Sequence, residues 1–337
     1  MGEVVALVED GHACSLRVGT LLSMWRAAAS ALWIALVAVV ACSSEEDRVR
    51  DRPRPERSAP PVTTGSPEVA DRVVEVGGRQ RTYRLYVPGS LDRSRPAPLV
   101  VVLHGGFGTG TGAVRVGRWD REAEDRGFLT AAPDGVGRTW NAGICCGPAQ
   151  RDGVDDVVFV VALVDDVAAE YDLDRRRVYA TGLSNGGLMA YRLACDAADR
   201  FAAVAPLAAT LPIECRPGSL VSLLHIHGLA DENIPFVGGA GEKGVVAIDW
   251  PPARDGVERW VEIDGCAGDP TVNEGGGVTT ESWAVCDDGT AVELVTIAGG
   301  GHSWPGGQRL PAPFDPPSNA FDATPAIWDF FAAHPKR

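Results

Sequence analysis

The sequence predicts an α/β domain in which helices flank a mostly parallel, doubly wound sheet. Continuous apolar segments, which are typical of buried parallel strands, alternate with helical segments along most of the 337 residues. In addition, the apolar run Arg177–Thr181 leads through a glycine-rich turn into a helical segment at 187–198. The length suits a single large domain. We therefore expect one α/β domain at 71–337.

The strands and helices are expected from short local patterns. Residues 73–76 and 82–87 alternate apolar and polar residues around Gly77-Gly78 and predict an opening hairpin. Residues 98–103 and 128–132 are buried-type strands, and residues 155–171 have helical spacing with Asp155 or Asp152 as the N-cap. Next come strands at 177–181, 201–207 and 220–227, helices at 187–198 and 254–263, strands at 278–285 and 291–297, and a closing helix at 324–334.

The pentapeptide Gly182-Leu183-Ser184-Asn185-Gly186 has the form G-x-S-x-G. A serine on a sharp turn between a strand and a helix is the arrangement of a nucleophile elbow, in which small residues let the backbone turn tightly. The pentapeptide alone is a weak signal, because glycine and serine are common in loops. Its strand–turn–helix context makes Ser184 a candidate nucleophile.

A nucleophilic serine needs a base, and His302 is the candidate. It lies in the glycine-rich segment 298–305, after a strand-like run, and it follows Ser184 in the chain order that nucleophile-elbow enzymes use. The alternative is an ordinary loop histidine. The other five histidines are terminal, precede the serine or alternate along an apolar strand: His12, His334, His104, His225 and His227.

The acid that would orient His302 is expected to be Asp231. It follows the buried-type strand 220–227 through Gly228-Leu229-Ala230, and active sites of open α/β sheets gather beyond the carboxyl ends of strands. Glu232 is the nearest rival. A turn or helix-capping role for Asp231 is the structural alternative.

The stretch His104-Gly105-Gly106 follows the apolar strand 98–103 and predicts an oxyanion loop. Backbone N–H groups of Gly106 and Asn185 would hold the negative oxygen of a tetrahedral intermediate. A plain strand-terminating turn is the alternative. Trp140, Asn141 and Trp304 are candidate substrate contacts, with simple packing as the alternative for the tryptophans.

Taken together, these motifs resemble the polyhydroxybutyrate (PHB) depolymerase and feruloyl esterase-like branch of the α/β-hydrolases, including its secreted lipoprotein members. The resemblance extends over roughly 73–334, and its motifs are His104–Gly106, 132–135 with Trp140-Asn141, 154–157, 182–191, 227–231 and 300–305. It implies an α/β-hydrolase fold, a Ser184–Asp231–His302 triad and hydrolysis of carboxylic esters through an acyl-enzyme.

The resemblance leaves the substrate open between short hydroxyalkanoate oligomers and feruloyl or acetyl esters. The sequence leaves no room after His334 for a polymer-binding domain, so soluble esters or oligomers are expected. A peptidase of the same fold and an inactive surface-binding lipoprotein are the alternatives. No cofactor or metal is expected. The net charge of −14 argues against a nucleic-acid partner, and the oligomeric state is left open.

The N-terminal segment 1–41 is expected to be an export signal, with an apolar run at 27–41 that is short for a membrane span. Val39-Val40-Ala41-Cys42 resembles a bacterial lipobox, which implies lipidation of Cys42 and anchoring to the cell membrane. An uncleaved signal anchor is the alternative. Translation is hypothesised to begin at Met24, because acidic residues precede it. Residues 42–70 are rich in proline and charge and predict a flexible tether.

Six further cysteines suggest disulfides in an exported protein. The count permits 15 pairings, of which we expect two short-range ones and a vicinal pair. A zinc site is the alternative, but no C-x-x-C motif is present. The expected pairs are Cys145 with Cys146, Cys195 with Cys215, and Cys266 with Cys286.

Overall fold

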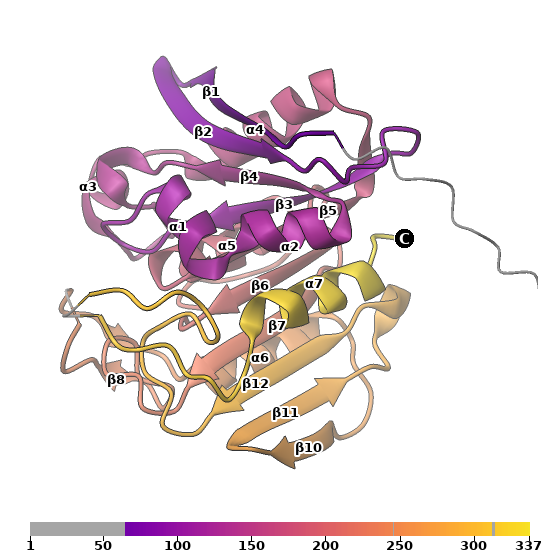
Figure 1. Ribbon diagram of the computed structural model, residues 1–337. Coiled ribbons are helices and arrows are strands. Elements are labelled where there is room, and N and C mark those ends of the chain that lie inside the picture. Colours follow the sequence, from indigo (N-terminus) through magenta and orange to yellow (C-terminus); the bar gives the residue numbers. More distant parts are fainter. Residues whose placement is uncertain (1–64, 245, 312–313) are drawn as a thin grey trace, which may run out of the picture. The chain divides into compact units, whose positions relative to one another are not determined.

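The computed structural model describes residues 65–244, 246–311 and 314–337 (Figure 1). The predictions of an export signal at 1–41, a start at Met24, a lipidated Cys42 and most of the tether at 42–70 fall outside these residues. The first strand begins at Glu68, so the folded domain includes a few residues that the sequence assigned to the tether.

The main sheet of the described residues has ten strands in the order β1-β2-β4-β3-β5-β6-β7-β12-β11-β10. The inner strands from β4 to β12 pair in parallel, and the pairs at both edges are antiparallel. The predicted mostly parallel sheet is therefore confirmed. The strands are β1 (Glu68–Val76), β2 (Arg79–Val87), β3 (Ala97–Leu103), β4 (Leu129–Pro133), β5 (Leu173–Leu183), β6 (Ala203–Leu207), β7 (Ser222–Gly228), β10 (Thr271–Gly275), β11 (Val278–Trp283) and β12 (Val292–Ile297), with β8 (Gly239–Ala240) and β9 (Asp249–Trp250) forming a separate pair.

Helices cover both faces of this sheet. Figure 1 shows α2 and α7 in front of the strands and α4, α5 and α6 behind them. Asp155 caps α4 by accepting the backbone N–H of Val158 at 3.0 Å, which decides between the two caps expected from the sequence. The helices are α1 (Gly110–Gly117), α2 (Trp119–Arg126), α3 (Gly147–Arg151), α4 (Asp156–Glu170), α5 (Asn185–Asp196), α6 (Ala253–Ile263) and α7 (Ala323–Ala333).

Several elements were not expected from the sequence, for physical reasons. Helix α1 begins and ends with glycine and contains two valines, all weak helix formers. Helix α2 is strongly polar, and only its Trp119 and Ala123 are buried. Strand β10 is exposed along its whole length at the sheet edge, so it lacks the alternation that marks a half-buried strand.

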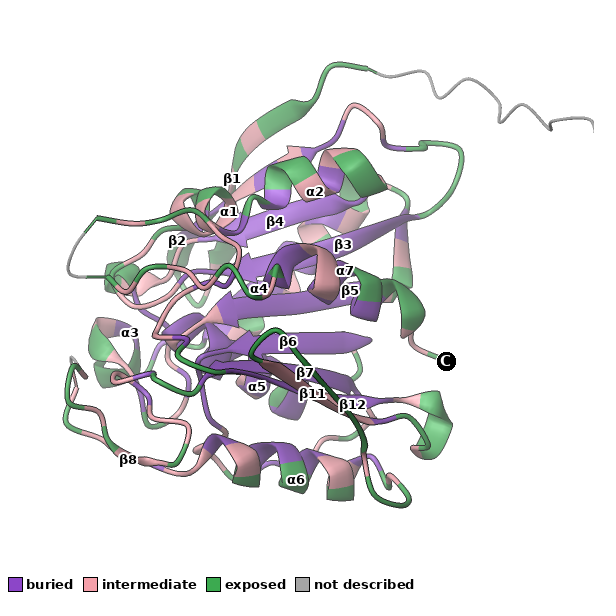
Figure 2. Cartoon of the chain, turned by 60° about the horizontal axis from the view of Figure 1, so that its bottom comes forward, coloured by how far each residue is buried: buried purple, intermediate pink, exposed green. Residues whose placement is uncertain are grey.

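The sheet separates two hydrophobic cores. All seven residues of β3 are buried, and they alternate between the faces: Leu99, Val101 and Leu103 join one core, whereas Val100 and Val102 join the other. Figure 2 shows the same arrangement, with purple central strands and green outer surfaces on the helices. The continuous apolar character of such strands follows from burial on both faces.

A buried ion pair fixes the first residue of α4 against β2. Arg81 donates to Asp156 at 2.7 Å, with exposed fractions of 4% and 0%, and the guanidinium lies 3.9 Å from the ring centroid of Phe159. The second carboxylate oxygen of Asp156 accepts the backbone N–H of Asn141 at 2.8 Å. The pair therefore also anchors the loop that follows β4.

The three expected disulfides are present, between Cys145 and Cys146, Cys195 and Cys215, and Cys266 and Cys286. The latter two each join cysteines 20 positions apart. Closing such a loop restricts the unfolded chain and typically stabilises the fold by about 3 kcal/mol.

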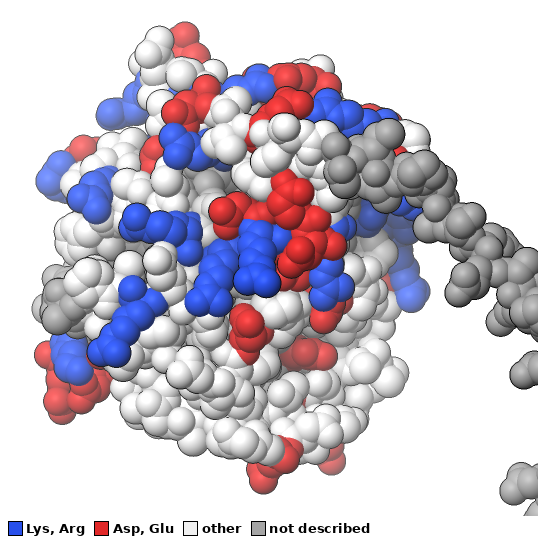
Figure 3. Space-filling model, in the orientation of Figure 1, with Lys and Arg blue, Asp and Glu red and all other residues white. Residues whose placement is uncertain are grey.

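Acidic and basic side chains intermingle on the face drawn in Figure 3. Arg126 on α2 pairs with Glu122 on its own helix and with Asp329 on α7, both at 3.1 Å. Within residues 65–337, apart from the gaps, no helix is long and apolar enough to cross a membrane.

Asp264, at the carboxyl end of α6, is an acidic side chain inside the core, and its burial has a measurable effect on stability. Its side chain is fully buried, and among the described residues no group makes a hydrogen bond of ordinary geometry to either carboxylate oxygen, although the Thr290 hydroxyl and the Val221 N–H are near enough to offset part of the effect of burial on its pKa. Burial raises the pKa of Asp264 to about 7. The folded protein therefore keeps this proton to higher pH than the unfolded chain, whose pKa is about 3.9, and loses stability as the pH rises from about 4 to about 7.

We expect Asp264→Asn to remove this loss and to raise the free energy of unfolding at pH 8 by up to about 4 kcal/mol. Urea unfolding at pH 4 and pH 8 measures the difference, which should be small at pH 4. Exposed Asp269 gives the control, Asp269→Asn. A stability gain that is equal at both pH values would contradict the conclusion that burial raises the pKa of Asp264.

Candidate active site

Ser184 occupies a sharp turn between β5, which ends at Leu183, and α5, which begins at Asn185. Its φ of 58° and ψ of −123° are unusual for a residue with a side chain, as expected of a strained nucleophile elbow. A Cβ at Gly186 would collide with the carbonyl oxygens of Leu103 and His104, and one at Gly182 would collide with Gly186. The two glycines of the pentapeptide are therefore required by the close packing of the turn against β3.

His302 and Asp231 form a hydrogen-bonded pair. His302 Nδ1 lies 2.7 Å from Asp231 Oδ2, and because the carboxylate only accepts, the proton is on Nδ1 and Nε2 is free to act as a base. Asp231 Oδ1 accepts the backbone N–H groups of Asn233 and Ile234 at 2.8 and 2.9 Å. These contacts hold the carboxylate in one orientation.

The loops that carry this pair are joined through their backbones. Ala230 N–H donates to the carbonyl of Gly300 at 2.8 Å, and a Cβ at Gly228 would collide with that same carbonyl. His302 N–H donates to Asp315 Oδ2 at 2.8 Å. The ends of β7 and β12 are thus held at a fixed separation, although their residues are far apart in sequence.

The structure distinguishes Asp231 from its rival Glu232. Glu232 is half-buried and pairs with Lys243, whereas Asp231 is 4% exposed and reaches His302. Burial raises the pKa of Asp231, but the hydrogen bond from His302 and the nearby His302 and His227 outweigh burial and hold that pKa below its usual value. Asp231 is therefore ionised at neutral pH.

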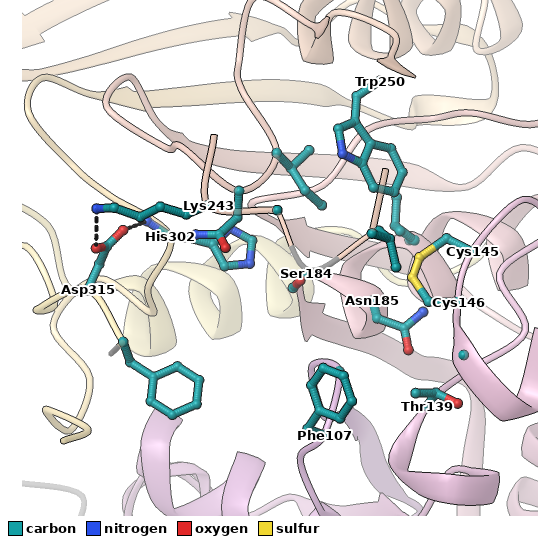
Figure 4. Close-up of a pocket in the computed structure, with 18 residues that line it drawn as sticks. Phe107, Thr139, Cys145, Cys146, Ser184, Asn185, Lys243, Trp250, His302 and Asp315 are labelled. Carbon is teal, nitrogen blue, oxygen red and sulfur yellow. Dashed lines mark hydrogen bonds and ion pairs between the residues drawn. A yellow bond between two sulfur atoms is a disulfide. The ribbon is translucent and has the colours of Figure 1, made fainter. Parts of the chain in front are cut away.

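Ser184 and His302 border the same cavity, and Figure 4 shows the His302 ring beside the Ser184 hydroxyl. Hydrogen bonds between a nucleophile and its base often become short only in the complex with substrate. The arrangement places a hydroxyl nucleophile, an imidazole and a carboxylate in sequence, which is suited to acyl transfer.

Two backbone N–H groups are available near Ser184. Asn185 is the first residue of α5, so its N–H has no partner within the helix and lies at the positive end of the helix dipole. Gly106 lies on the loop after β3, at the wall of the cavity. Together they are the candidate oxyanion donors expected from the sequence.

His104 holds the loop that carries Gly106. Its Nδ1 donates to the carbonyl of Gly105 at 2.8 Å, and its Nε2 accepts the N–H of Gly135 at 3.0 Å, which defines a neutral tautomer. Burial lowers the pKa of His104 and favours this neutral form. The ring therefore connects the loop after β3 to the loop after β4.

Trp140 and Asn141 do not lie on the cavity surface, contrary to the prediction of substrate contact. Trp140 is fully buried, packs 4.7 Å from the His104 ring and donates its indole N–H to the His104 carbonyl at 2.8 Å. Asn141 Nδ2 donates to the carbonyl of Val154 at 2.9 Å. The internal hydrogen bonds of both side chains make them supports of the loop.

Trp304 lies at the edge of a second cavity but is only 4% exposed. Its indole N–H donates to Thr324 at 2.9 Å, and its ring packs edge-on against Trp119 at 6.0 Å. Most of its surface therefore stabilises the core beneath the cavity.

Two adjoining cavities meet at Ser184, with volumes of about 280 and 300 Å³. The residues that line both cavities are Gly106, Phe107, Ser184, His302, Phe314 and Asp315. The first is closed by the vicinal disulfide Cys145–Cys146 and by Trp250, whereas Arg115 and Leu310 border the second. Sequence reasoning missed Phe107 and Phe314. Phe107 directly follows the His-Gly-Gly motif and offered a signal, but nothing local marks Phe314.

The side chain of Asn185 connects the nucleophile elbow to the loop after β4 by hydrogen bonds to the backbone of Trp140. Its Oδ1 accepts the backbone N–H of Trp140 at 2.7 Å, and its Nδ2 donates to the Trp140 carbonyl at 3.0 Å. Asn185 thus lines the cavity, and its side chain separately holds the loop. Within the described residues, no group of three or more His, Cys, Asp or Glu side chains is arranged to hold a metal ion.

Comparison with known proteins finds similarity to esterases. The family model described as Esterase PHB depolymerase matches residues 81–217. NocK of Nocardia uniformis subsp. tsuyamanensis, named as an esterase, is 34% identical over 302 residues and covers 81% of this chain and 88% of its own. Feruloyl esterase C of Emericella nidulans is 30% identical over 277 residues, covering 79% of this chain and 88% of its own.

Among solved structures, the acetyl xylan esterase from Aspergillus awamori matches with a TM-score of 0.54 at 15% identity, over 79% of this chain and 99% of that one. At this identity the match concerns the fold alone. The mostly parallel sheet, its flanking helices and the elbow at Ser184 are those of the α/β-hydrolase fold, as predicted.

We expect Asn185→Ala to lower the free energy of unfolding by about 1–3 kcal/mol, because it leaves the buried backbone N–H of Trp140 without its partner, whereas the Trp140 carbonyl still accepts the N–H of Cys146. The backbone N–H of residue 185 remains, so activity on small acyl esters should fall less than activity on bulky ones. Denaturant unfolding and initial rates on acetyl and aryl-acrylate esters measure both effects. Exposed Asn273 gives the control, Asn273→Ala. An equal loss on all esters would contradict the separation of roles.

Proposed function

This chain belongs to the PHB depolymerase esterase family, in the branch of the feruloyl esterases, and from that premise we propose that it hydrolyses carboxylic esters through an acyl-enzyme on Ser184. The observation that carries the proposal is the strained Ser184 beside the His302–Asp231 pair, whose Nδ1–Oδ2 distance is 2.7 Å. Neither the serine nor the imidazole would be effective alone, because the hydroxyl needs a base and the base needs an oriented tautomer.

In the first half of the reaction, Ser184 Oγ attacks the ester carbonyl carbon while His302 Nε2 takes the hydroxyl proton. The carbonyl oxygen becomes an oxyanion and accepts the N–H groups of Gly106 and Asn185. The bond between carbon and the alcohol oxygen then breaks, and His302 returns its proton to the departing alcohol. Asp231 stabilises the charged imidazole throughout this step.

In the second half, His302 takes a proton from water as the water oxygen attacks the acyl-enzyme. The tetrahedral intermediate collapses, the bond to Ser184 Oγ breaks, and the hydroxyl recovers its proton from His302. The products are a carboxylic acid and an alcohol, and no cofactor takes part.

We propose feruloyl-type esters as the first substrates to consider. An ester has an acyl and an alcohol part on either side of the carbonyl carbon, and the two cavities that meet at Ser184 can accommodate two sizeable parts. The first cavity has flat apolar walls at Phe107, Trp250 and the Cys145–Cys146 disulfide, which suit an aromatic acyl group. Acetyl esters and short hydroxyalkanoate oligomers are the competing substrates.

We also propose that the protein is exported and held at the cell membrane through a lipid on Cys42. Three disulfides support an oxidising compartment, and the lipobox-like Val39-Val40-Ala41-Cys42 supports the anchor. Mass spectrometry of the protein from the membrane fraction should find a lipidated cysteine at the mature N-terminus. Recovery of peptides from 1–41 in the mature protein would contradict this proposal.

We expect the wild-type enzyme to hydrolyse methyl ferulate faster than a 3-hydroxybutyrate trimer or an acetyl ester. Ser184→Ala should lower kcat by at least about 10⁴-fold on every ester, because the nucleophile is lost. Labelling of Ser184 by a fluorophosphonate probe measures the nucleophile independently of the substrate.

The outcomes separate the mechanism from the substrate. Preference for the trimer would replace the feruloyl assignment and leave the mechanism intact. Unchanged activity of Ser184→Ala, or absence of labelling in the active wild type, would overturn the mechanism itself.

A further inference from the structure

Behind the catalytic carboxylate, three polar rings form a buried row. His225 and His227 lie on the same face of β7, two residues apart, with exposed fractions of 0% and 1%. Tyr191 on α5 covers them and is also fully buried. The reaction described above does not use these side chains, and polar groups are costly to bury unless they are hydrogen-bonded.

The hydrogen bonds of the row can have only one direction. His227 Nε2 lies 2.9 Å from the carbonyl of Ile234, which can only accept, so Nε2 carries the proton. In the neutral ring Nδ1 is then an acceptor, and it receives His225 Nε2–H at 3.0 Å. His225 Nδ1 in turn accepts the Tyr191 hydroxyl at 2.8 Å.

Both imidazoles are held neutral by their surroundings. Burial lowers the pKa of His227, and burial together with the neighbouring His227 lowers the pKa of His225 well below its usual value. The titratable groups that act on His227 from the catalytic side are Asp231 and His302. At the cavity, Lys243 pairs with both Glu232 and Asp315. The direction of the row is therefore stable across neutral pH.

The row ends on the turn that holds Asp231. Ile234 uses its N–H to bind Asp231 Oδ1 at 2.9 Å and its carbonyl to bind His227 Nε2 at 2.9 Å. The same nitrogen lies 3.6 Å from Asp231 Oδ2, the oxygen that binds His302. This is beyond hydrogen-bond distance, but the partial positive charge of the N–H still favours the ionised carboxylate.

We propose that His227, supported by His225 and Tyr191, is a positioning residue that holds Asp231 in line with His302. The inference rests on the proposed function, because it assigns to the row an effect on the same Ser184 chemistry. Placement of a catalytic group matters steeply, since misplacement by about 1 Å can lower a rate by about 100-fold. Apolar rings could fill the same space but could not bind the Ile234 carbonyl.

The principal test replaces His227 by phenylalanine, which keeps an aromatic ring and removes both hydrogen bonds. We expect kcat of His227→Phe to fall by about 10- to 100-fold with little change in KM, because Asp231 and not the cavity is displaced. His227→Gln, which retains an N–H donor, should recover part of the lost rate. Unchanged kcat in folded His227→Phe, or a loss confined to KM, would overturn the proposal.

A milder pair of variants applies even where His227→Phe does not fold. Tyr191→Phe removes only the hydroxyl at the far end of the row and should lower kcat by a smaller factor. Its matched control is Tyr179→Phe, because Tyr179 is equally buried and its hydroxyl has no hydrogen-bond partner among the described residues. Equal kcat for the two tyrosine variants would argue against a row that acts on Asp231.

A double-mutant cycle shows through which residue the row acts. In the Asp231→Asn background, the oriented carboxylate is already lost, so adding His227→Phe should change kcat little further. A purely structural role would instead multiply the two losses. Ser184→Ala separates the two proposals: if it is inactive while His227→Phe is fully active, only the positioning role fails, whereas an active Ser184→Ala overturns the proposed function.

Discussion

The parallel pairing of the inner strands is the constraint on which the candidate site depends. In-register hydrogen bonds from β3 through β5, β6 and β7 to β12 bring the carboxyl ends of these strands to one edge of the sheet. The loops beyond four of them carry Gly106, Ser184, Asp231 and His302. Each group is contributed by a different strand, so the rigidity of the sheet sets their mutual distances, as is usual for open α/β sheets.

That rigidity is transmitted to the loops by unusually close backbone contacts. The elbow packs on the carbonyls that end β3, and the turn after β7 packs on the loop after β12, so tightly that Gly186 and Gly228 have no room for a Cβ. A larger residue at either position would separate two of the functional groups. The two glycines thus set the distances between the functional groups, and the reaction depends on them although they need not touch the substrate.

Several buried polar side chains on the cavity side bind the backbone of a loop and restrain it. Asp156 holds the Asn141 backbone, Asn185 holds that of Trp140, and His104 connects two loops through a single neutral ring. Asp264, far from these loops in sequence, is buried without such partners and lowers stability at high pH. The contrast fits a general pattern, in which a buried polar group either specifies a geometry or costs free energy.

The sequence by itself determined the elbow around Ser184, the order of serine, acid and histidine, and the parallel sheet, and short loop closure made the observed cysteine pairs the expected ones. These features depend on local backbone conformation, hydrophobic periodicity or short loop closure, which neighbouring residues encode. The tertiary structure decided between Asp231 and Glu232, moved Trp140 and Asn141 from the cavity to its support, and brought Phe314 and Trp250 to the wall. It also joined Tyr191 to His225 and His227, which sequence reasoning treated as ordinary strand residues. Such contacts join side chains from separate elements, and only the packing of those elements fixes which of them meet.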